Sequence, residues 1–166
     1  MQINSEKTNS FKEALANYPT GVTVVTATDE NHTPIGLTVN SFASVSLDPL
    51  LVLWSIDKRV STYETFKNID KFAINILADN QSEIASLFAS SNQDRFANCD
   101  WSSSEHSLPL IKGAIASLQC RTFKQIEAGD HMILIGEIIE IDVEKRLPLV
   151  YHGRKLGALP AIFHES

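Results

Sequence analysis

Side chains that can hydrogen-bond a ligand are concentrated in one segment, Gly36-Leu37-Thr38-Val39-Asn40-Ser41-Phe42-Ala43-Ser44-Val45-Ser46. Side chains of a strand alternate between its two faces, so Thr38 and Asn40 can line one wall while their neighbours face the core. The amide of Asn40 both donates and accepts, which matches the mixed edge of a heterocycle. The segment therefore predicts a site for a flat ligand. The alternative is a polar edge strand whose hydroxyls bond the nearby backbone.

A second cluster combines hydroxyls with positive charge where a predicted strand gives way to a predicted helix. Its members are Ser55, Lys58, Arg59, Ser61 and Thr62. The free N–H groups of a helix N-terminus favour anions, and neighbouring cations and hydroxyls strengthen that preference. This cluster predicts a phosphate site, because it follows the first segment closely in sequence. The alternative is a capped surface helix with solvated charges.

A third candidate is His131, which follows Gly129-Asp130 at a predicted hairpin turn. The turn itself explains the glycine, which supplies a positive φ, and the aspartate, which bonds its own backbone. The turn does not explain the histidine. A neutral imidazole at this position can orient a substrate by hydrogen bonding, so His131 is the candidate catalytic residue.

Composition and spacing argue against several other classes of protein. The formal charge of −6 disfavours a nucleic-acid or anionic-membrane surface, and no apolar run is long enough to span a membrane. Five scattered histidines and two cysteines without a CxxC motif give no metal-ligand spacing, so no metal site is expected. No carboxylate pair or nucleophile elbow is recognisable. Without a signal segment, and with two thiols expected to remain reduced, the default is a cytoplasmic protein.

The elements that must position these residues are mostly strands. Strands are expected at 22–28, 51–56, 72–77, 114–126, 132–143 and 149–151, and helices at 61–68 and 82–89. A further helix is expected to begin at the capping box Ser10-Phe11-Lys12-Glu13, and a long polar loop at 90–107. Many strands with short turns favour a closed antiparallel barrel in a single domain over residues 1–166. No Gly-x-Gly-x-x-Gly follows the first strand, which disfavours a Rossmann site.

Together these motifs resemble the flavin reductase family, which has the FMN-binding split-barrel fold, a mainly β, antiparallel architecture. The resemblance covers about residues 11–156 and depends on the order of its motifs. These are Pro19-Thr20-Gly21-Val22, Gly36–Phe42, Ser44-Val45-Ser46-Leu47-Asp48-Pro49, Ser61-Thr62, Phe72–Leu77, Leu87-Phe88-Ala89, Asp94-Arg95-Phe96, Gly129-Asp130-His131, Gly136-Glu137 and Pro148-Leu149-Val150-Tyr151.

The resemblance implies a homodimer that passes a hydride from NADH or NADPH to FMN or FAD and supplies a separate monooxygenase. It implies ring and ribityl contacts from Thr38, Val39, Asn40, Ser41, Phe42, Ser44, Val45 and Ser46. It implies phosphate contacts from Ser55, Ile56, Lys58, Ser61 and Thr62. It also implies that His131 lies near the nicotinamide and Tyr151 near the flavin.

The residue types agree with this chemistry, because hydride transfer between two bound rings needs alignment more than it needs an acid–base pair. The sequence therefore predicts an NAD(P)H-dependent flavin reductase. The alternative is a flavin-binding carrier or sensor of the same fold that has no reductase activity.

Overall fold

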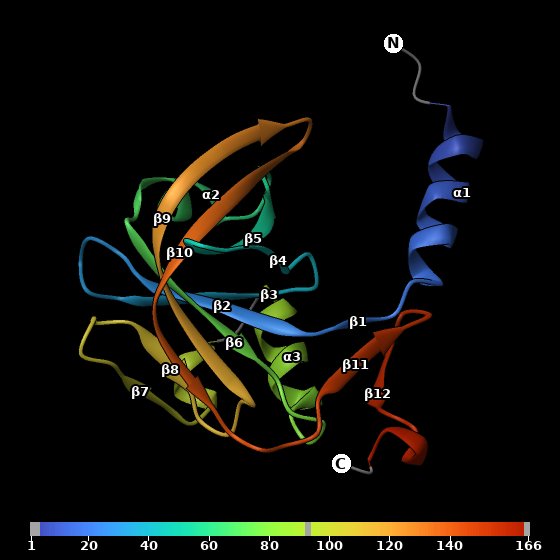
Figure 1. The fold of residues 1–166 in the computed structure, drawn as a ribbon. Coiled ribbons are helices and arrows are strands. Elements are labelled where there is room, and N and C mark those ends of the chain that lie inside the picture. The colour runs from blue at the N-terminus through green and yellow to red at the C-terminus, as the bar shows by residue number, and fades with distance from the viewer. Residues whose placement is uncertain (1–3, 92–93, 165–166) are drawn as a thin grey trace.

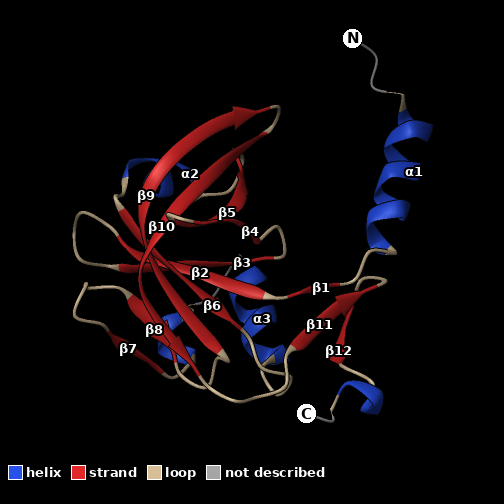
Figure 2. Ribbon diagram, in the orientation of Figure 1, coloured by secondary structure: helices blue, strands red, loops and turns tan. Residues whose placement is uncertain are grey.

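The computed structural model describes residues 4–91 and 94–164, and its centre is a seven-stranded antiparallel sheet (Figure 2). In sheet order the strands are β3 (Pro34–Val39), β2 (Thr23–Thr28), β6 (Lys71–Ile76), β9 (Ala116–Ala128), β10 (His131–Val143), β5 (Leu50–Asp57) and β4 (Ala43–Leu47). The predicted mainly β, antiparallel architecture is confirmed. The five predicted strands that enter this sheet are all found within a few residues of their expected ends.

Smaller elements surround the sheet. A three-stranded sheet consists of β1 (Thr20–Gly21), β11 (Leu149–His152) and β12 (Lys155–Ala158), and a two-stranded one of β7 (Trp101–Ser103) and β8 (Pro109–Ile111). The α-helices are α1 (Ser5–Ala16), α2 (Tyr63–Asn68) and α3 (Ser82–Ala89), and two short 3-10 helices cover Phe96–Asn98 and Ala161–Phe163. The expected loop at 90–107 therefore contains β7 and a 3-10 turn; residues 92–93 lie outside the described residues.

The expectation of a hydrogen-bonded, closed barrel is wrong for the part of the chain that the structure describes. The seven-stranded sheet ends at β3 on one side and at β4 on the other, and these two strands share no ladder. Other groups occupy the free side of β3. The Arg95 guanidinium donates to the Gly36 carbonyl, and the Thr38 hydroxyl donates to the Ala85 carbonyl of α3. A helix and a side chain thus take the place of a closing strand.

Two clusters of buried apolar side chains pack against the strands of the sheet. One cluster centres on Trp54, whose ring meets Phe66 and Phe72 edge-on at centroid distances of 5.1 and 5.8 Å. A second cluster joins α3 to the β8 and β11 regions through residues such as Phe88 and Leu149. The strands that carry the candidate residues are therefore anchored by buried side chains, which keeps a site built on them rigid.

The first helix differs from its predicted form. It begins at Ser5, because the Asn4 side chain accepts the backbone N–H groups of Glu6 and Lys7 at 3.1 and 3.3 Å. Asn is a preferred N-cap, so Ser10 lies mid-helix and its expected capping box is not formed. The helix extends away from the rest of the protein (Figure 1) and contributes no buried residue. No helix among the described residues has the length and apolarity needed to cross a membrane.

Candidate functional site

A groove of about 340 Å³ lies between β3, α3 and the β11–β12 hairpin. Its walls combine apolar side chains with hydroxyls, an amide and a single arginine. The lining residues are Val22, Thr38, Val39, Asn40, Ala85, Ser86, Ala89, Tyr151, Arg154 and Leu156. Four predicted site residues, Thr38, Val39, Asn40 and Tyr151, are thus brought together from distant parts of the sequence. This composition suits a ligand with a flat apolar body and a polar edge.

Close packing of α3 on β3 forms one wall of the groove. The Thr38 hydroxyl donates to the Ala85 carbonyl at 2.6 Å, so its remaining hydrogen-bonding capacity is as an acceptor. Gly36 permits the close approach, because a Cβ atom there would lie 2.9 Å from Cε1 of Phe88. The wall therefore depends on a glycine and a buried phenylalanine that lie outside the predicted set.

The opposite wall comes from the β11–β12 hairpin. Tyr151 pairs with Thr20 of β1, and the N–H of Gly153 donates to the Ala16 carbonyl at 2.8 Å. Strand register places His152 opposite Lys155, which leaves a two-residue turn. The hairpin is thus tied at its tip and along its length, and it holds Tyr151 at the groove.

Two hydrogen bonds between Ser41 and Ser55 connect the first predicted segment to the strand that leads to the second predicted cluster. The Ser41 hydroxyl accepts the Ser55 N–H at 3.0 Å and donates to the Ser55 carbonyl at 3.2 Å. Ala43 is the ladder partner of Leu53, so residue 41 falls opposite residue 55 by the same register. The Ser41 side chain therefore replaces a strand partner at this point and joins the first predicted segment to β5.

The predicted phosphate cluster lies further along β5, and its cations have acidic neighbours. Lys58 Nζ is 3.9 Å from a Glu127 carboxylate oxygen, and Arg59 is bonded to Asp57 at 2.7 Å. The side-chain hydrogen bond from Arg59 holds the pKa of Asp57 well below its usual range. Lys58 keeps a partly open side chain, at 34% exposure. Arg59 is more exposed, at 82%, but its 2.7 Å ion pair is much closer than the 3.9 Å contact of Lys58, so Lys58 is the more weakly paired cation of this cluster.

The helix next to this cluster is short. α2 has six residues, and its N-cap Thr62 makes no side-chain capping hydrogen bond. The helix predicted at 61–68 is confirmed from Tyr63 to Asn68. A single short helix adds little dipole to an anion site, so any phosphate affinity has to come from Lys58 and the hydroxyls of Ser61 and Thr62.

His131 opens β10 directly after the turn Gly129-Asp130, and Gly129 has the positive φ of 63° that the turn requires. The imidazole Nδ1 lies 2.7 Å from a carboxylate oxygen of Asp130, and this hydrogen bond lowers the pKa of Asp130. When Nδ1–H donates to the carboxylate, Nε2 of a neutral imidazole is an acceptor. His131 pairs across the sheet with Asp57, so it lies beside the Lys58 end and does not line the groove.

The remaining predicted residues lie elsewhere. Ile56 is 1% exposed, so it can offer a ligand little more than its backbone. Phe42 packs against the main core. Ser44 and Val45 are exposed on the edge strand β4, with half-buried Ser46, and none of the three lines the groove.

Sequence reasoning missed six lining residues, namely Val22, Ala85, Ser86, Ala89, Arg154 and Leu156. The sequence predicts the helix 82–89 but no site residue within it. Ala85, Ser86 and Ala89 share one face of this helix at helical spacing, and such a small-residue face is the signal that could have suggested close approach of a ligand.

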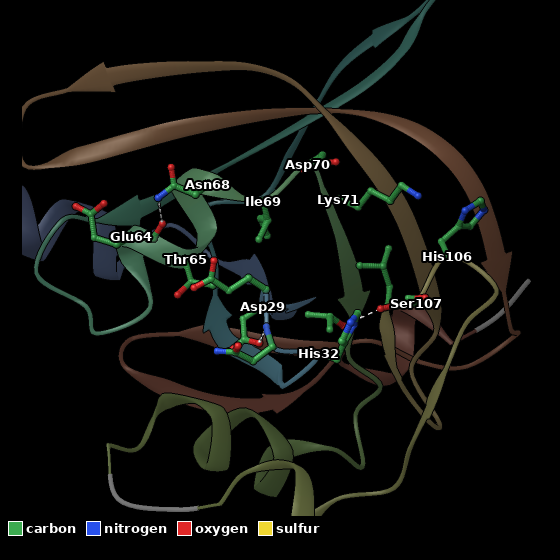
Figure 3. A pocket seen from close by; sticks show the side chains of 14 residues that line it. Asp29, His32, Glu64, Thr65, Asn68, Ile69, Asp70, Lys71, His106 and Ser107 are labelled. Atoms are coloured by element: carbon green, nitrogen blue, oxygen red, sulfur yellow. Dashed lines mark hydrogen bonds between the residues drawn. The ribbon is translucent and has the colours of Figure 1, made fainter.

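A larger hollow of about 580 Å³ lies between the β2–β3 turn, α2 and residues 106–108, and it contains none of the predicted site residues (Figure 3). Carboxylates from Asp29, Glu30, Glu64 and Asp70 line it. Over residues 4–91 and 94–164, no group of three or more His, Cys, Asp or Glu side chains is arranged to hold a metal ion.

Comparison with known proteins gives relatives over most of the chain. The model of the flavin reductase like domain matches residues 15–160. The reductase component of the trigonelline monooxygenase of Acinetobacter baylyi is 48% identical over 132 residues, which cover 80% of this chain and 43% of that protein. The NADH-dependent FMN reductase SmoA of Agrobacterium fabrum is 42% identical, over 92% of this chain and 86% of that protein.

Solved structures agree with these relatives. The NADH:FAD oxidoreductase SgcE6 of Streptomyces globisporus, in a complex with NAD and FAD fragments, superposes with a TM-score of 0.89 at 33% identity, over 97% of this chain and 98% of that one. This similarity, shared with other flavin reductase structures, confirms the predicted split-barrel fold. This chain spans less than half of the first relative and most of the second. By its match over residues 15–160, the chain belongs to the family of flavin reductase like domains.

Proposed function

We propose that this protein is an NAD(P)H-dependent flavin oxidoreductase that uses FMN or FAD. The observation that carries this proposal is the order of three polar sites: the mixed groove at Thr38 and Asn40, the Ser41–Ser55 bridge next to it in sequence, and Lys58 further along the same strand direction. Ser55 and Lys58 are three residues apart, which is roughly 10 Å along a strand. A flavin has a flat ring, a polyhydroxyl chain and a phosphate in that order, so its parts match this order of sites.

The groove has the donor set that a flavin ring requires. Asn40 and Ser86 are exposed polar residues at the groove, and Val22, Ala85 and Leu156 supply apolar contact. A bound flavin supplies the two-electron acceptor that a hydride from NADH or NADPH needs. The protein's own contribution is to hold the two rings in contact and to exclude alternative orientations, which is worth several kcal/mol when alignment is good.

We infer that His131 orients the pyridine nucleotide. The Asp130 carboxylate holds the imidazole by its Nδ1, which leaves Nε2 available as an acceptor for the carboxamide of a nicotinamide. The lowered pKa of Asp130 keeps that carboxylate charged at neutral pH. His131 is therefore assigned to substrate orientation, with Asp130 as its positioning residue.

The unpartnered first helix supports a proposed homodimer. α1 contributes no buried residue, and Phe11, Leu15 and Tyr18 are 62%, 52% and 68% exposed. A helix of 12 residues is only marginally stable in water without packing, so a second copy of the chain is the proposed partner of this face. Sedimentation at micromolar concentration is expected to give twice the chain mass, and a monomer would contradict the dimer.

A partner monooxygenase and a cytoplasmic setting complete the proposal. The A. baylyi relative is named as a reductase component, which supports a role in delivering reduced flavin to a separate oxygenase. Cys99 and Cys120 are both free thiols, which agrees with a reducing compartment.

An anaerobic spectrum tests the reductase function directly. The purified protein is mixed with FMN or FAD and then with NADH or NADPH, and the flavin absorption band is followed. Bleaching at a rate far above that of the mixture without protein is expected for the enzyme. Binding without bleaching would instead support the carrier or sensor alternative, and the four combinations would show which flavin and which nucleotide are used.

The variant His131→Ala separates nucleotide orientation from flavin binding. Turnover with NADH is expected to fall about tenfold or more, because an orienting hydrogen bond is lost, while the flavin dissociation constant changes little. His164→Ala is the control, since His164 lies in the C-terminal segment with its imidazole against the Leu159 carbonyl. Equal losses of turnover and flavin affinity in His131→Ala would remove the assigned role.

A further inference from the structure

Arg154 occupies an unusual backbone position beside the groove. It is the second residue of the two-residue turn between β11 and β12, and its φ is +61° after a Gly153 φ of +57°. Two positive φ angles define the type I′ hairpin, in which Gly, Asn or Asp is strongly preferred. An arginine in the left-handed region is unfavourable, because its Cβ crowds the following carbonyl oxygen. Such an outlier next to a groove suggests a function for the side chain.

The charges around the groove single out the same residue. Arg154 is the one charged residue among the ten that line the groove, and no carboxylate is among them. Three other arginines are engaged within the protein: Arg59 with Asp57, Arg95 with the Gly36 and Ser90 carbonyls, and Arg146 with Glu144. Among the described residues, Arg121 and Arg154 have no such hydrogen bond or ion pair, and of these two only Arg154 lines the groove. In a chain of net charge −6, this groove is a local site for an anion.

The position of Arg154 relative to the proposed flavin path indicates which anion it meets. Thr38 and Asn40, the proposed ring contacts, line the groove together with Arg154, whereas Lys58 and Ser61, the proposed phosphate contacts, do not line it. Accepting a hydride converts the neutral flavin ring to an anion at neutral pH and leaves the oxidised nucleotide, so the negative charge arises at the ring end. A fixed cation there stabilises the charge as it develops.

We propose that Arg154 binds the anionic, reduced form of the flavin ring and so raises the affinity of this groove for reduced flavin relative to the affinity that the groove would have without this cation. The inference rests on the proposed function, because it assumes that the ring lies in the groove. It adds a residue that distinguishes two redox states of one ligand. The unfavourable turn conformation is retained, on this view, because the guanidinium acts on the ligand.

The test measures affinity, not turnover. Dissociation constants of riboflavin and FMN, each oxidised and anaerobically reduced, are determined for the wild type, Arg154→Asn, Arg154→Lys and Lys155→Gln. Asn is well tolerated at positive φ, so Arg154→Asn is expected to fold with no loss of thermal midpoint. Lys155 is the neighbouring exposed cation that does not line the groove, so its variant controls for net charge.

Arg154→Asn is expected to weaken binding of both reduced flavins about tenfold while changing the oxidised forms less than twofold, since a charge-assisted contact is lost. That tenfold change lowers the midpoint potential of the bound flavin by about 30 mV. Arg154→Lys is expected to recover much of the preference, and Lys155→Gln to resemble the wild type.

Three outcomes would overturn the inference. Equal losses for all four ligands would mean that Arg154 only packs against the flavin. A loss confined to FMN in both redox states would assign Arg154 to the phosphate. An unchanged Arg154→Asn would leave the residue without a role at this ligand. In each case a wild type that still bleaches flavin with NADH keeps the proposed function, whereas a wild type that binds no flavin ends the function itself.

Discussion

The two hollows of this protein differ in charge more than in size. The larger one, near α2 and the β2–β3 turn, is lined by Asp29, Glu30, Glu64 and Asp70. The smaller groove near α3 is lined by no carboxylate and by one arginine. Four carboxylates outnumber the one lysine, Lys71, in the first hollow, so an anionic ligand such as the proposed flavin nucleotide is expected to prefer the second.

The polar groups of the larger hollow are also occupied by the fold. One Asp29 oxygen accepts the N–H groups of Asn31 and Thr33 at 2.8 and 2.9 Å, and the His106 imidazole lies 3.0 Å from a Glu140 carboxylate oxygen. These groups shape a turn and hold a loop. Volume alone would therefore favour the larger hollow, whereas the charge and the hydrogen-bonding capacity of the lining favour the groove as the proposed flavin site.

Filling each hollow in turn with a bulky side chain is expected to give the largest difference in flavin affinity. Ser86→Phe places a ring in the groove from an exposed position of α3, and flavin affinity is expected to fall about a hundredfold because the ring competes for the ligand's volume. Fluorescence titration with FMN measures the change.

The matched control places the same ring in the larger hollow. Glu64→Phe changes an exposed position of α2, and FMN affinity is expected to stay within about twofold of the wild type. Should Glu64→Phe lose FMN while Ser86→Phe retains it, the two hollows would exchange their assignments.

Displacing α3, which forms one wall of the groove, is expected to have the next largest effect on FMN affinity. In Gly36→Ala the new Cβ would lie 2.9 Å from Cε1 of Phe88, a ring that is 1% exposed and packs edge-on against Phe96 at 5.1 Å. The ring cannot yield freely, so α3 is expected to shift, with a loss of about 1–3 kcal/mol in unfolding free energy and about tenfold weaker FMN binding.

Gly157→Ala is the control for this prediction, because no atom lies within 4 Å of its added Cβ and its φ is not positive. Urea denaturation and FMN titration on both variants check the prediction. Equal stability of the two variants would show that the close contact between Gly36 and Phe88 does not determine the position of α3 on β3.

Most of the fold could be predicted because its signals are local. β-branched runs such as 22–28 gave strands, and the helix Ser82–Ala89 has the predicted bounds. The closed barrel could not be excluded from local pattern, since strand pairing at the sheet edges depends on distant residues such as Arg95, whose guanidinium binds the Gly36 carbonyl on β3. The start of α1 was missed because the Ser10 capping box competed with Asn4.

The candidate site was predictable only where its residues are polar and close in sequence. Thr38, Asn40 and Ser41 stood out as hydroxyl and amide groups within a strand-like run. Arg154 did not, because its importance depends on a positive φ and on charge neighbours that only the fold brings together. Ser44 continues the alternating pattern but lies on the exposed edge strand β4 and outside the groove, so its predicted flavin contact stays a prediction.

Removing the hydrogen bonds between Ser41 and Ser55 is expected to change stability and FMN affinity less than the groove variants do. In Ser41→Ala the Ser55 N–H and carbonyl lose their partner, which costs about 1–2 kcal/mol of unfolding free energy. FMN affinity is expected to fall about threefold to tenfold, because the middle of the path is no longer fixed. Ser44→Ala, on exposed β4, is expected to change neither quantity. Equal stability and FMN affinity of Ser41→Ala and Ser44→Ala would show that the Ser41–Ser55 bridge does not link the groove to the Lys58 cluster in binding FMN.

The smallest effect is expected from the charges of the larger hollow. In the double variant Glu64→Gln with Asp70→Asn two exposed carboxylates lose their charge, and FMN affinity is expected to rise by less than about twofold at 0.15 M salt. At 0.01 M salt the screening length is about three times longer, so the rise is expected to grow, since only long-range repulsion is removed. A large change in FMN affinity that does not depend on salt would mean that FMN contacts this hollow directly. The proposed assignment of FMN to the groove, and not to the larger hollow, would then be wrong.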